Sequence, residues 1–205
     1  MRTPPHIGSQ NMDDQEIIRA PAVLSVIHAD TECIGFTLAS EPKTGALLRA
    51  LAASKPSGEF LELGTGTGVG TAWLLAGMDA RSHLTSVDSD SKVQDVARRH
   101  LGHDARVTFH LGDGGVFLDQ SGGRQFDLIY ADAWPGKFPH LEQTLDLLKE
   151  GGIYFVDDLL PQPAWPEGHA ARIPPLIAQL EAQKGFIATK LAWASGLMIL
   201  VRTSI

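Results

Sequence analysis

The sequence lacks several features that mark particular classes of protein. Its 205 residues contain a single cysteine, Cys33, so no internal disulfide can form. No apolar run is long enough to span a bilayer, and the start MRTPPHIGSQNMDDQ has no apolar core of the kind found in a secretory signal. We therefore expect a cytoplasmic protein without a membrane partner. The apolar context ECIGF predicts that Cys33 is a packed core residue and not a nucleophile.

Positive charge is also scarce. The chain carries 17 Lys and Arg against 24 Asp and Glu, which gives a formal net charge of −7. Nonspecific binding to a nucleic acid needs a dense surface of Lys and Arg, and this composition does not offer one. We expect a small-molecule substrate and no nucleic-acid partner.

Strand-like and helix-like segments alternate along most of the chain. Helical patterns such as SKVQDVARRHL lie between β-rich runs that end in Gly or Asp. Two final β-rich runs, joined at residues 194–196, predict a terminal hairpin. Strands that alternate with crossover helices predict a mostly parallel α/β sheet covered on both faces. The five runs before the hairpin are Phe60–Leu63, Leu84–Val87, Val107–Leu111, Phe126–Ala131 and Ile153–Val156.

Local signals predict several helix boundaries. The segment SEPKTGALLRALAA predicts a helix with Ser40 as its N-cap and Pro42 in its first turn. An earlier helix is expected to begin near Asp13 and to be limited or bent by Pro21. The segment PHLEQTLDLLKE predicts a helix that ends at residues 151–152, which are both glycine.

The length of the chain suits one domain with a sizeable core. We expect residues 1–12 to be a flexible lead-in and residues 13–205 to form a single domain. Within it, helices occupy 13–55 and the α/β core occupies 56–205. Short apolar stretches before Ser40, such as PAVLSVI, are compatible with packing in a homodimer or over the active site, and the sequence favours neither.

The segment EFLELGTGTGVGTAWLL, residues 59–75, concentrates four glycines in one turn between a strand and a helix. Such a turn directs backbone N–H groups and a helix N-terminus at a ligand, without side chains in the way. The glycines stand at alternate positions, which departs from the G-x-G-x-x-G pattern of dinucleotide sites, and no Lys follows them as in a P-loop. The glycines are Gly64, Gly66, Gly68 and Gly70.

Three acidic residues accompany this turn. Asp88 ends the next strand, where a carboxylate accepts hydrogen bonds from a ribose. Glu62 precedes the first glycine by two residues, a position that suits the cationic amino-acid end of a ligand. The alternative is that Glu62 caps a turn and the glycines serve tight packing. Asp113 follows the third strand in HLGDGG, where it suits the edge of a base or forms an ordinary Asx turn.

In this order and spacing the motifs resemble those of the class I S-adenosylmethionine-dependent methyltransferases. ELGTGTGVG resembles their first motif, VDSD their second-strand acidic motif and GDGG their adenine-side turn. The resemblance covers roughly residues 40–202 and implies a Rossmann-like fold, with a seven-stranded, mostly parallel sheet and a C-terminal antiparallel hairpin. ASEPKTGALLRAL resembles the segment that closes over the cofactor in the catechol and caffeoyl-coenzyme A O-methyltransferase branch. The cofactor-binding residues implied are Glu62 at the methionine end, Gly64, Thr65 and Gly66 along it, Asp88 at the ribose and Asp113 at the adenine.

Three further carboxylates follow the fourth and fifth strands. Asp132 ends FDLIYAD, and Asp157 and Asp158 end GGIYFVDD. Carboxylates that converge raise one another's pKa unless a cation such as Mg²⁺ offsets them, so we expect a divalent metal site here. The alternative is that each Asp caps a loop or helix. The catechol-type branch uses an Asp and an Asp-Asn pair for its metal, so Asp158 stands where that branch usually has Asn.

The base that would accept the substrate proton departs from the same branch. Many members have Lys three residues after the first Asp, but position 135 here is Pro. Lys137 is the catalytic candidate, with a solvated surface lysine as the alternative, and His140 and His169 are further candidate bases. Tryptophan faces could wall a pocket for a flat substrate or simply pack under a loop. These tryptophans are Trp134 and Trp165.

The resemblance implies an S-adenosylmethionine-dependent methyltransferase that acts on a hydroxyl of a small molecule with help from a divalent metal. One alternative is a metal-independent methyltransferase of the same fold that acts on nitrogen or another atom, with Asp132 contacting substrate or cofactor directly. A nicotinamide oxidoreductase is disfavoured by the glycine spacing. A catalytically silent cofactor-binding protein is the third alternative.

Overall fold

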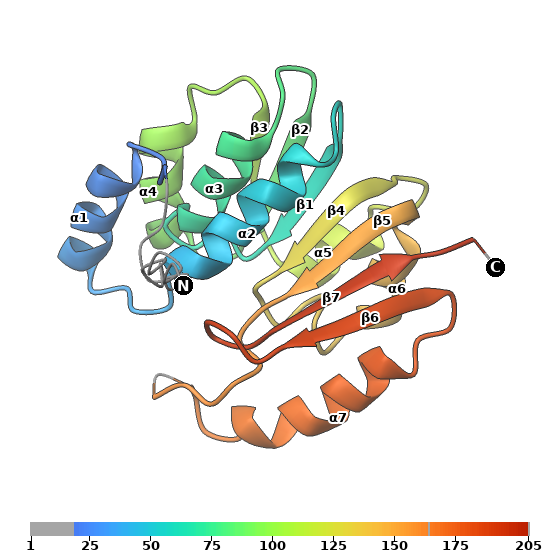
Figure 1. Ribbon diagram of the computed structural model, residues 1–205. Coiled ribbons are helices and arrows are strands. Elements are labelled where there is room, and N and C mark those ends of the chain that lie inside the picture. Colours follow the sequence, from blue (N-terminus) through green and yellow to red (C-terminus); the bar gives the residue numbers. More distant parts are fainter. Residues whose placement is uncertain (1–18, 164, 205) are drawn as a thin grey trace, which may run out of the picture.

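The computed structural model describes residues 19–163 and 165–204. Its seven strands form one sheet in the order β3-β2-β1-β4-β5-β7-β6 (Figure 1). The pairs among β1 to β5 are parallel, while β7 runs antiparallel to both β5 and β6. The predicted sheet and its terminal hairpin are therefore confirmed. The strands are β1 (Glu59–Leu63), β2 (His83–Asp88), β3 (Val107–Leu111), β4 (Phe126–Ala131), β5 (Leu148–Val156), β6 (Phe186–Leu191) and β7 (Leu197–Arg202).

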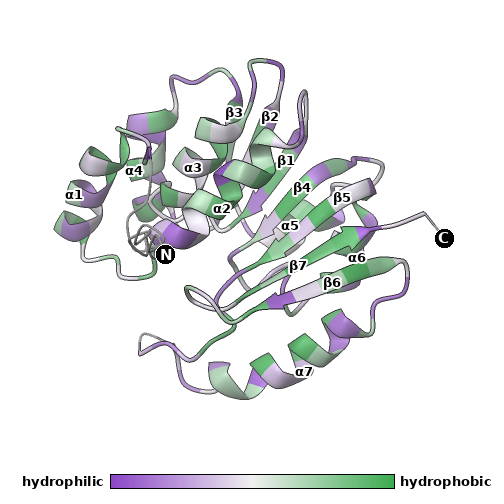
Figure 2. Ribbon diagram, viewed as in Figure 1, coloured by the Kyte–Doolittle hydropathy of each residue, from purple (hydrophilic) through white to green (hydrophobic). Residues whose placement is uncertain are grey.

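Alternate residues of the central strands point to opposite faces and build two separate hydrophobic cores. In β1, Leu61 and Leu63 belong to the core shared with α5, α6 and α7, whereas Phe60 belongs to the core shared with α1, α2 and α3. Both faces are therefore apolar, and Figure 2 shows hydrophobic residues along the central strands. The helices are α1 (Leu24–Ile34), α2 (Pro42–Ala53), α3 (Val69–Gly77), α4 (Ser91–Leu101), α5 (Gly114–Asp119), α6 (Leu141–Asp146) and α7 (His169–Glu181).

The predicted end of the helix after β4 is wrong. α6 ends at Asp146, and β5 already begins at Leu148. The reason is tertiary pairing. Leu148 is fully buried and pairs with Phe126 of β4, and the N–H of Phe126 donates to the carbonyl of Leu147 at 2.8 Å. Gly151, which was expected to stop the helix, instead lies inside the strand with a φ of +72°.

Two expectations about the N-terminal helices are also wrong. Glu41, not Ser40, is the N-cap residue of α2, and its side chain makes no capping hydrogen bond. Cys33 is exposed, because the buried residues of α1 are Leu24, Ile27 and Thr31 and position 33 lies off that face. The expected flexible lead-in at 1–12 and the helix start near residue 13 lie outside the described residues.

None of the helices within residues 19–163 and 165–204 is long and apolar enough to cross a membrane.

Candidate active site

The glycine turn lies directly after β1, at the carboxyl edge of the parallel strands. Gly64, Gly66 and Gly68 have φ values of +103°, +52° and +92°, which side chains with a Cβ rarely adopt. The N–H of Gly66 donates to Asp88 Oδ2 at 2.8 Å, so the end of β2 holds the turn. A Cβ on Gly70 would lie 2.5 Å from Glu62 Oε1. The glycines thus allow the left-handed backbone of the turn and leave room for neighbouring groups to pack closely against it.

Glu62 lies beneath this turn and is fully buried. Its Oε2 accepts hydrogen bonds from the hydroxyls of Ser86 and Thr71. Its Oε1 has no hydrogen-bond partner among the described residues. Burial raises the pKa of Glu62 to about 8, more than the two hydroxyl hydrogen bonds lower it. The side chain is therefore a buried acid with one unused acceptor under the floor of the glycine turn.

Asp88 and Asp113, two further carboxylates predicted to bind the cofactor, lie at neighbouring strand ends. Asp88 ends β2 and pairs with Leu111, the last residue of β3, and Asp113 follows β3 by two residues. Asp88 Oδ1 accepts the N–H of Asp90 at 2.9 Å, in addition to the bond from the glycine turn. Asp113 is exposed and is the N-cap residue of α5, with Oδ1 accepting the N–H of Val116 at 2.9 Å. Each carboxylate keeps unused lone pairs, because Asp88 accepts two and Asp113 accepts one of the roughly four hydrogen bonds that a carboxylate can take.

A small space of about 10 Å³ remains over the glycine turn. Phe36 covers it, since its ring would lie 3.4 Å from a Cβ on Gly66. A larger cavity of about 480 Å³ adjoins this space, and the two share Leu38, Ala39, Ser40 and Asp132. The segment between α1 and α2 therefore lies over the glycine turn and borders both spaces.

Lys137 lies inside the larger cavity and is only 3% exposed. Its ammonium donates to the backbone carbonyl of Asp157 at 2.7 Å. The chain reaches this position through a tight turn in which the N–H of Lys137 donates to the carbonyl of Trp134 and Gly136 has a φ of +86°. The alternative of a solvated surface lysine is therefore wrong.

Asp132 and Asp157 border the same cavity, and burial is the main cause of the raised pKa of each. The pKa of Asp132 rises to about 7, with the charge of Asp157 as the next cause, and the charge of Lys137 opposes the rise. Asp157 is 3% exposed and accepts a hydrogen bond from the Ser195 hydroxyl. The N–H of Asp158 also donates to Asp157 Oδ1 at 2.6 Å. The two carboxylates and the ammonium form one interacting cluster.

Asp158 lines the same cavity, but its carboxylate contacts other side chains. It adopts a φ of +65°, and its Oδ1 accepts the indole N–H of Trp165 at 2.5 Å. Its Oδ2 lies 3.6 Å from His169 Nε2. Within residues 19–163 and 165–204, no three His, Cys, Asp or Glu side chains form a group that could hold a metal ion. The metal site predicted at Asp132, Asp157 and Asp158 stays a prediction, and in this structure Oδ1 of Asp157 and Oδ1 of Asp158 accept hydrogen bonds from protein donors.

Aromatic side chains wall the cavity on the side of α7. Trp134 and Trp165 both line it, and Trp134 is 41% exposed. The rings of Trp165 and His169 lie 4.6 Å apart between centroids, and the Arg172 guanidinium lies 4.5 Å from the Trp134 ring centroid. Burial lowers the pKa of His169, and its ring nitrogens have no hydrogen-bond partner among the described residues. The other candidate base, His140, does not line this cavity.

Three polar residues that sequence reasoning missed belong to this region. Tyr130 donates to Asp157 Oδ2 at 3.3 Å, and Ser40 Oγ lies 3.1 Å from Tyr130 Oη and donates to Asp132 Oδ2 at 3.4 Å. Ser195, in the terminal hairpin, bonds Asp157. For Tyr130 a signal was available in the pairing of the predicted strands, because Tyr130 lies beside Glu62 when β1 and β4 pair.

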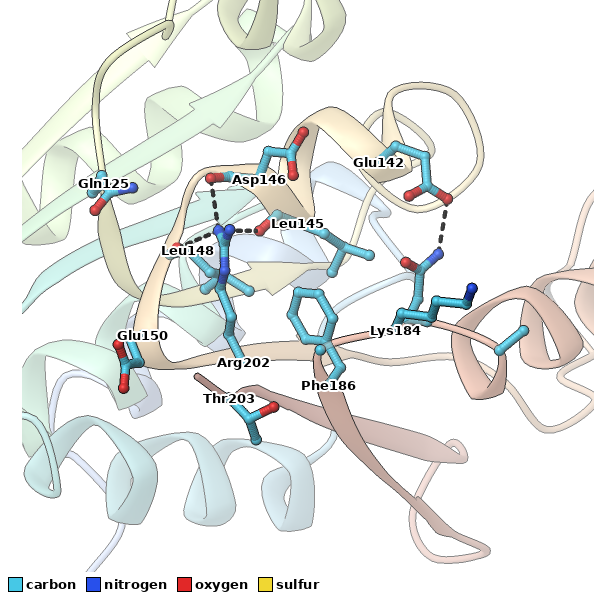
Figure 3. Close-up of a pocket in the computed structure, with 13 residues that line it drawn as sticks. Gln125, Glu142, Leu145, Asp146, Leu148, Glu150, Lys184, Phe186, Arg202 and Thr203 are labelled. Carbon is cyan, nitrogen blue, oxygen red and sulfur yellow. Dashed lines mark hydrogen bonds between the residues drawn. The ribbon is translucent and has the colours of Figure 1, made fainter. Parts of the chain in front are cut away.

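A second cavity, of about 770 Å³, lies at the opposite edge of the sheet (Figure 3). The Arg202 guanidinium crosses it and donates to the carbonyls of Leu145, Asp146 and Leu148. These bonds fasten the end of β7 to the connection between α6 and β5. Arg202 therefore has a structural role here, and the candidate site remains at the carboxyl edge.

Comparison with known proteins agrees with this geometry. Residues 61–159 match the family described as a methyltransferase domain. A Mycolicibacterium vanbaalenii protein, named for a presumed O-methyltransferase activity, is 32% identical over 123 residues, which cover 58% of this chain and 54% of that protein. The chain thus spans a little over half the length of the curated relatives it matches first.

Solved structures extend the likeness to nearly the whole chain. The O-methyltransferase from Bacillus cereus in complex with SAH has a TM-score of 0.80 at 20% identity, covering 92% of this chain and 94% of that one. TomG from Streptomyces achromogenes, an O-methyltransferase involved in tomaymycin synthesis and solved with SAM, has a TM-score of 0.76 at 21% identity, covering 92% of each chain. These likenesses show that the predicted class I methyltransferase fold is correct.

Proposed function

We propose that this protein is an S-adenosylmethionine-dependent O-methyltransferase that acts on a hydroxyl of a small, flat molecule, because residues 61–159 match the methyltransferase domain family. The relatives named for this activity support the reaction class. The acidic composition and the aromatic cavity wall support a small acceptor.

One observation carries this proposal. The space over the glycine turn and the larger cavity meet at Ser40 and Asp132, so a donor held by the turn and an acceptor held in the cavity would be adjacent. Transfer between two bound molecules depends mainly on holding them in line, because orientation replaces a bimolecular encounter. The two neighbouring spaces provide this arrangement.

The residues at the turn suit the cofactor. The positive-φ glycines leave room for close approach, and a Cβ on Gly70 would fill that room. The unused Oε1 of Glu62 lies under the turn, where it would accept a hydrogen bond from the ammonium of the methionine end, and that positive charge would favour the ionised carboxylate. Asp88 would accept the ribose hydroxyls, and Asp113 would lie near the adenine. Typical ligand pockets hold roughly 300–1,000 Å³, so the segment around Phe36 must move outward for the cofactor to enter.

S-Adenosylmethionine, when bound, supplies an electrophilic methyl group. The protein then has to hold the acceptor oxygen in line and favour its anionic form. Asp132 borders both spaces and orients the acceptor, and Trp134 and Trp165 hold its flat face. The divalent metal expected at Asp132, Asp157 and Asp158 stays a prediction, and no step is assigned to it.

The test is incubation of the purified protein with labelled S-adenosylmethionine and matched panels of phenols, catechols and aromatic amines. We expect label on the oxygen of a hydroxylated acceptor. Label found on amines alone would favour the nitrogen-methylating alternative. Tight S-adenosylhomocysteine binding with no transfer to any acceptor would favour the catalytically silent alternative.

A further inference from the structure

The candidate site contains a buried cation where a divalent metal was expected. We propose that the Lys137 ammonium takes the electrostatic role of that metal, so that it stabilises the oxyanion of the acceptor in a metal-independent reaction. This inference rests on the proposed O-methyl transfer. Four observations about the cluster formed by Asp132, Lys137 and Asp157 lead to it.

The first observation is charge balance. Asp132 and Asp157 line one cavity together with Lys137, whose ammonium lies 2.7 Å from the Asp157 carbonyl oxygen, and like charges this close are unfavourable without a compensating cation. The charge of Lys137 acts on both carboxylates and favours their ionised forms. The ammonium is only 3% exposed, so solvent screens this attraction weakly. Lys137 therefore provides the compensation that a metal would otherwise provide.

The second observation is the use of the carboxylate lone pairs. Asp157 accepts bonds from the Ser195 hydroxyl and from the N–H of Asp158, and Asp158 accepts the Trp165 indole N–H. A hard cation needs several oxygens that point at one centre. Here Oδ1 of Asp157 and Oδ1 of Asp158 point at protein donors, and no three His, Cys, Asp or Glu side chains within residues 19–163 and 165–204 form a group around one centre.

The third observation is the placement of the ammonium. Its bond to the Asp157 carbonyl uses one of three N–H donors, which leaves two for a ligand in the cavity. The preceding turn is packed tightly, because a Cβ on Gly136 would lie 2.4 Å from Leu63 Cδ1. The Tyr154 hydroxyl also donates to the Gly136 carbonyl at 2.9 Å. The turn therefore holds Lys137 in place before any ligand binds.

The fourth observation is the position of the cluster between the two spaces. Asp132 borders the donor space, and Lys137 lines the acceptor cavity beside it. As the acceptor oxygen bonds to the methyl carbon, the carbon–sulfur bond breaks and its electron pair remains on sulfur. The hydroxyl proton leaves to solvent through the cavity mouth. Lys137 keeps its own proton and stabilises the negative oxygen until the new bond forms.

The experiment compares wild-type protein, Lys137→Met and Lys137→Arg, with Lys184→Met as an exposed control. Three quantities are measured: turnover after EDTA treatment, Mn²⁺ binding by calorimetry, and the Kd of S-adenosylhomocysteine. We expect wild-type turnover to be unchanged by EDTA and no stoichiometric Mn²⁺ binding. Lys137→Met should lose turnover by about 100-fold or more, the size of effect seen when one oxyanion donor is removed. Its Kd for S-adenosylhomocysteine should stay close to that of the wild type, and Lys137→Arg should recover part of the turnover.

The metal measurement also separates this inference from the proposed function. Stoichiometric Mn²⁺ binding by the wild type, or turnover that EDTA abolishes and Mg²⁺ restores, would overturn it. Full turnover in Lys137→Met would overturn it as well. If no acceptor is methylated, the proposed O-methyl transfer fails, but the Mn²⁺ titration still decides whether Lys137 or a metal balances the carboxylates. Gain of Mn²⁺ binding in Lys137→Met alone would support the inference.

Discussion

The buried Glu62 predicts an unusual dependence of stability on pH. Its pKa rises from 4.5 to about 8 in the folded protein because burial disfavours the charged form. A raised pKa means that the folded state binds the proton more tightly than the unfolded state does. The stabilisation is therefore complete below pH 4.5 and is lost as the pH rises through about 8.

The substitution Glu62→Gln removes this titration while keeping the shape of the side chain. The amide oxygen can still accept from Ser86 and Thr71, and the amide nitrogen takes the place of the unused Oε1. Its unpaired N–H costs about 1–3 kcal/mol at every pH. The informative quantity is therefore how the difference in unfolding free energy between the variant and the wild type changes with pH. Between pH 5 and pH 8, at about 1.4 kcal/mol per pKa unit, the wild type should lose roughly 4 kcal/mol relative to the variant.

The assay is urea unfolding followed by tryptophan fluorescence at pH 5, 6.5 and 8. Glu167→Gln is the matched control, because Glu167 is exposed, and it should follow the wild type at each pH. The difference in unfolding free energy between Glu62→Gln and wild type should grow in favour of the variant as the pH rises. A difference that stays constant between pH 5 and pH 8 would refute the claim that burial keeps the Glu62 carboxyl neutral in the folded protein.

Three substitutions test the turn and the cluster. Gly68→Ala should lower the unfolding free energy by roughly 2–5 kcal/mol in urea titrations, because its φ is +92° and the new Cβ would lie 2.7 Å from that of Ala97. Gly66→Ala should cost only about 1 kcal/mol yet weaken S-adenosylhomocysteine binding about tenfold or more in calorimetry, because the added methyl enters the space between the turn and Phe36 where the cofactor would bind. Ser195→Ala should destabilise the protein by about 1–3 kcal/mol in thermal unfolding, because buried Asp157 loses a donor that lowers its pKa; an unchanged Tm would contradict that role.

Much of the fold was predictable because its signals are local. The helix SKVQDVARRHL was expected with the bounds that α4 has, and Asp90 caps it by accepting the N–H of Lys92 at 2.8 Å. The glycine turn was identified because only a ligand site or a very close approach explains so many glycines in one turn. The boundary between α6 and β5 was not predictable in this way. It depends on Phe126 and Leu148, which meet only in the folded sheet.

The site was predictable where its residues follow strand ends, and less so where it depends on contacts across the fold. Asp132 and Asp157 were found because the carboxyl ends of parallel strands share one edge. Nothing in the sequence shows that Ser195, in the distant hairpin, donates to Asp157. The burial of Lys137 depends on the turn at Gly136, and the direction of Asp158 depends on its left-handed backbone and on Trp165. Side-chain direction at these turns therefore could not be read from the sequence.

The proposed reaction requires the glycine turn to bind S-adenosylmethionine. The most direct test is calorimetric titration of the wild-type protein with S-adenosylhomocysteine, with NAD as the control nucleotide. We expect saturable binding of one S-adenosylhomocysteine per chain and no heat of binding for NAD. Binding of NAD, or of neither nucleotide, would contradict it.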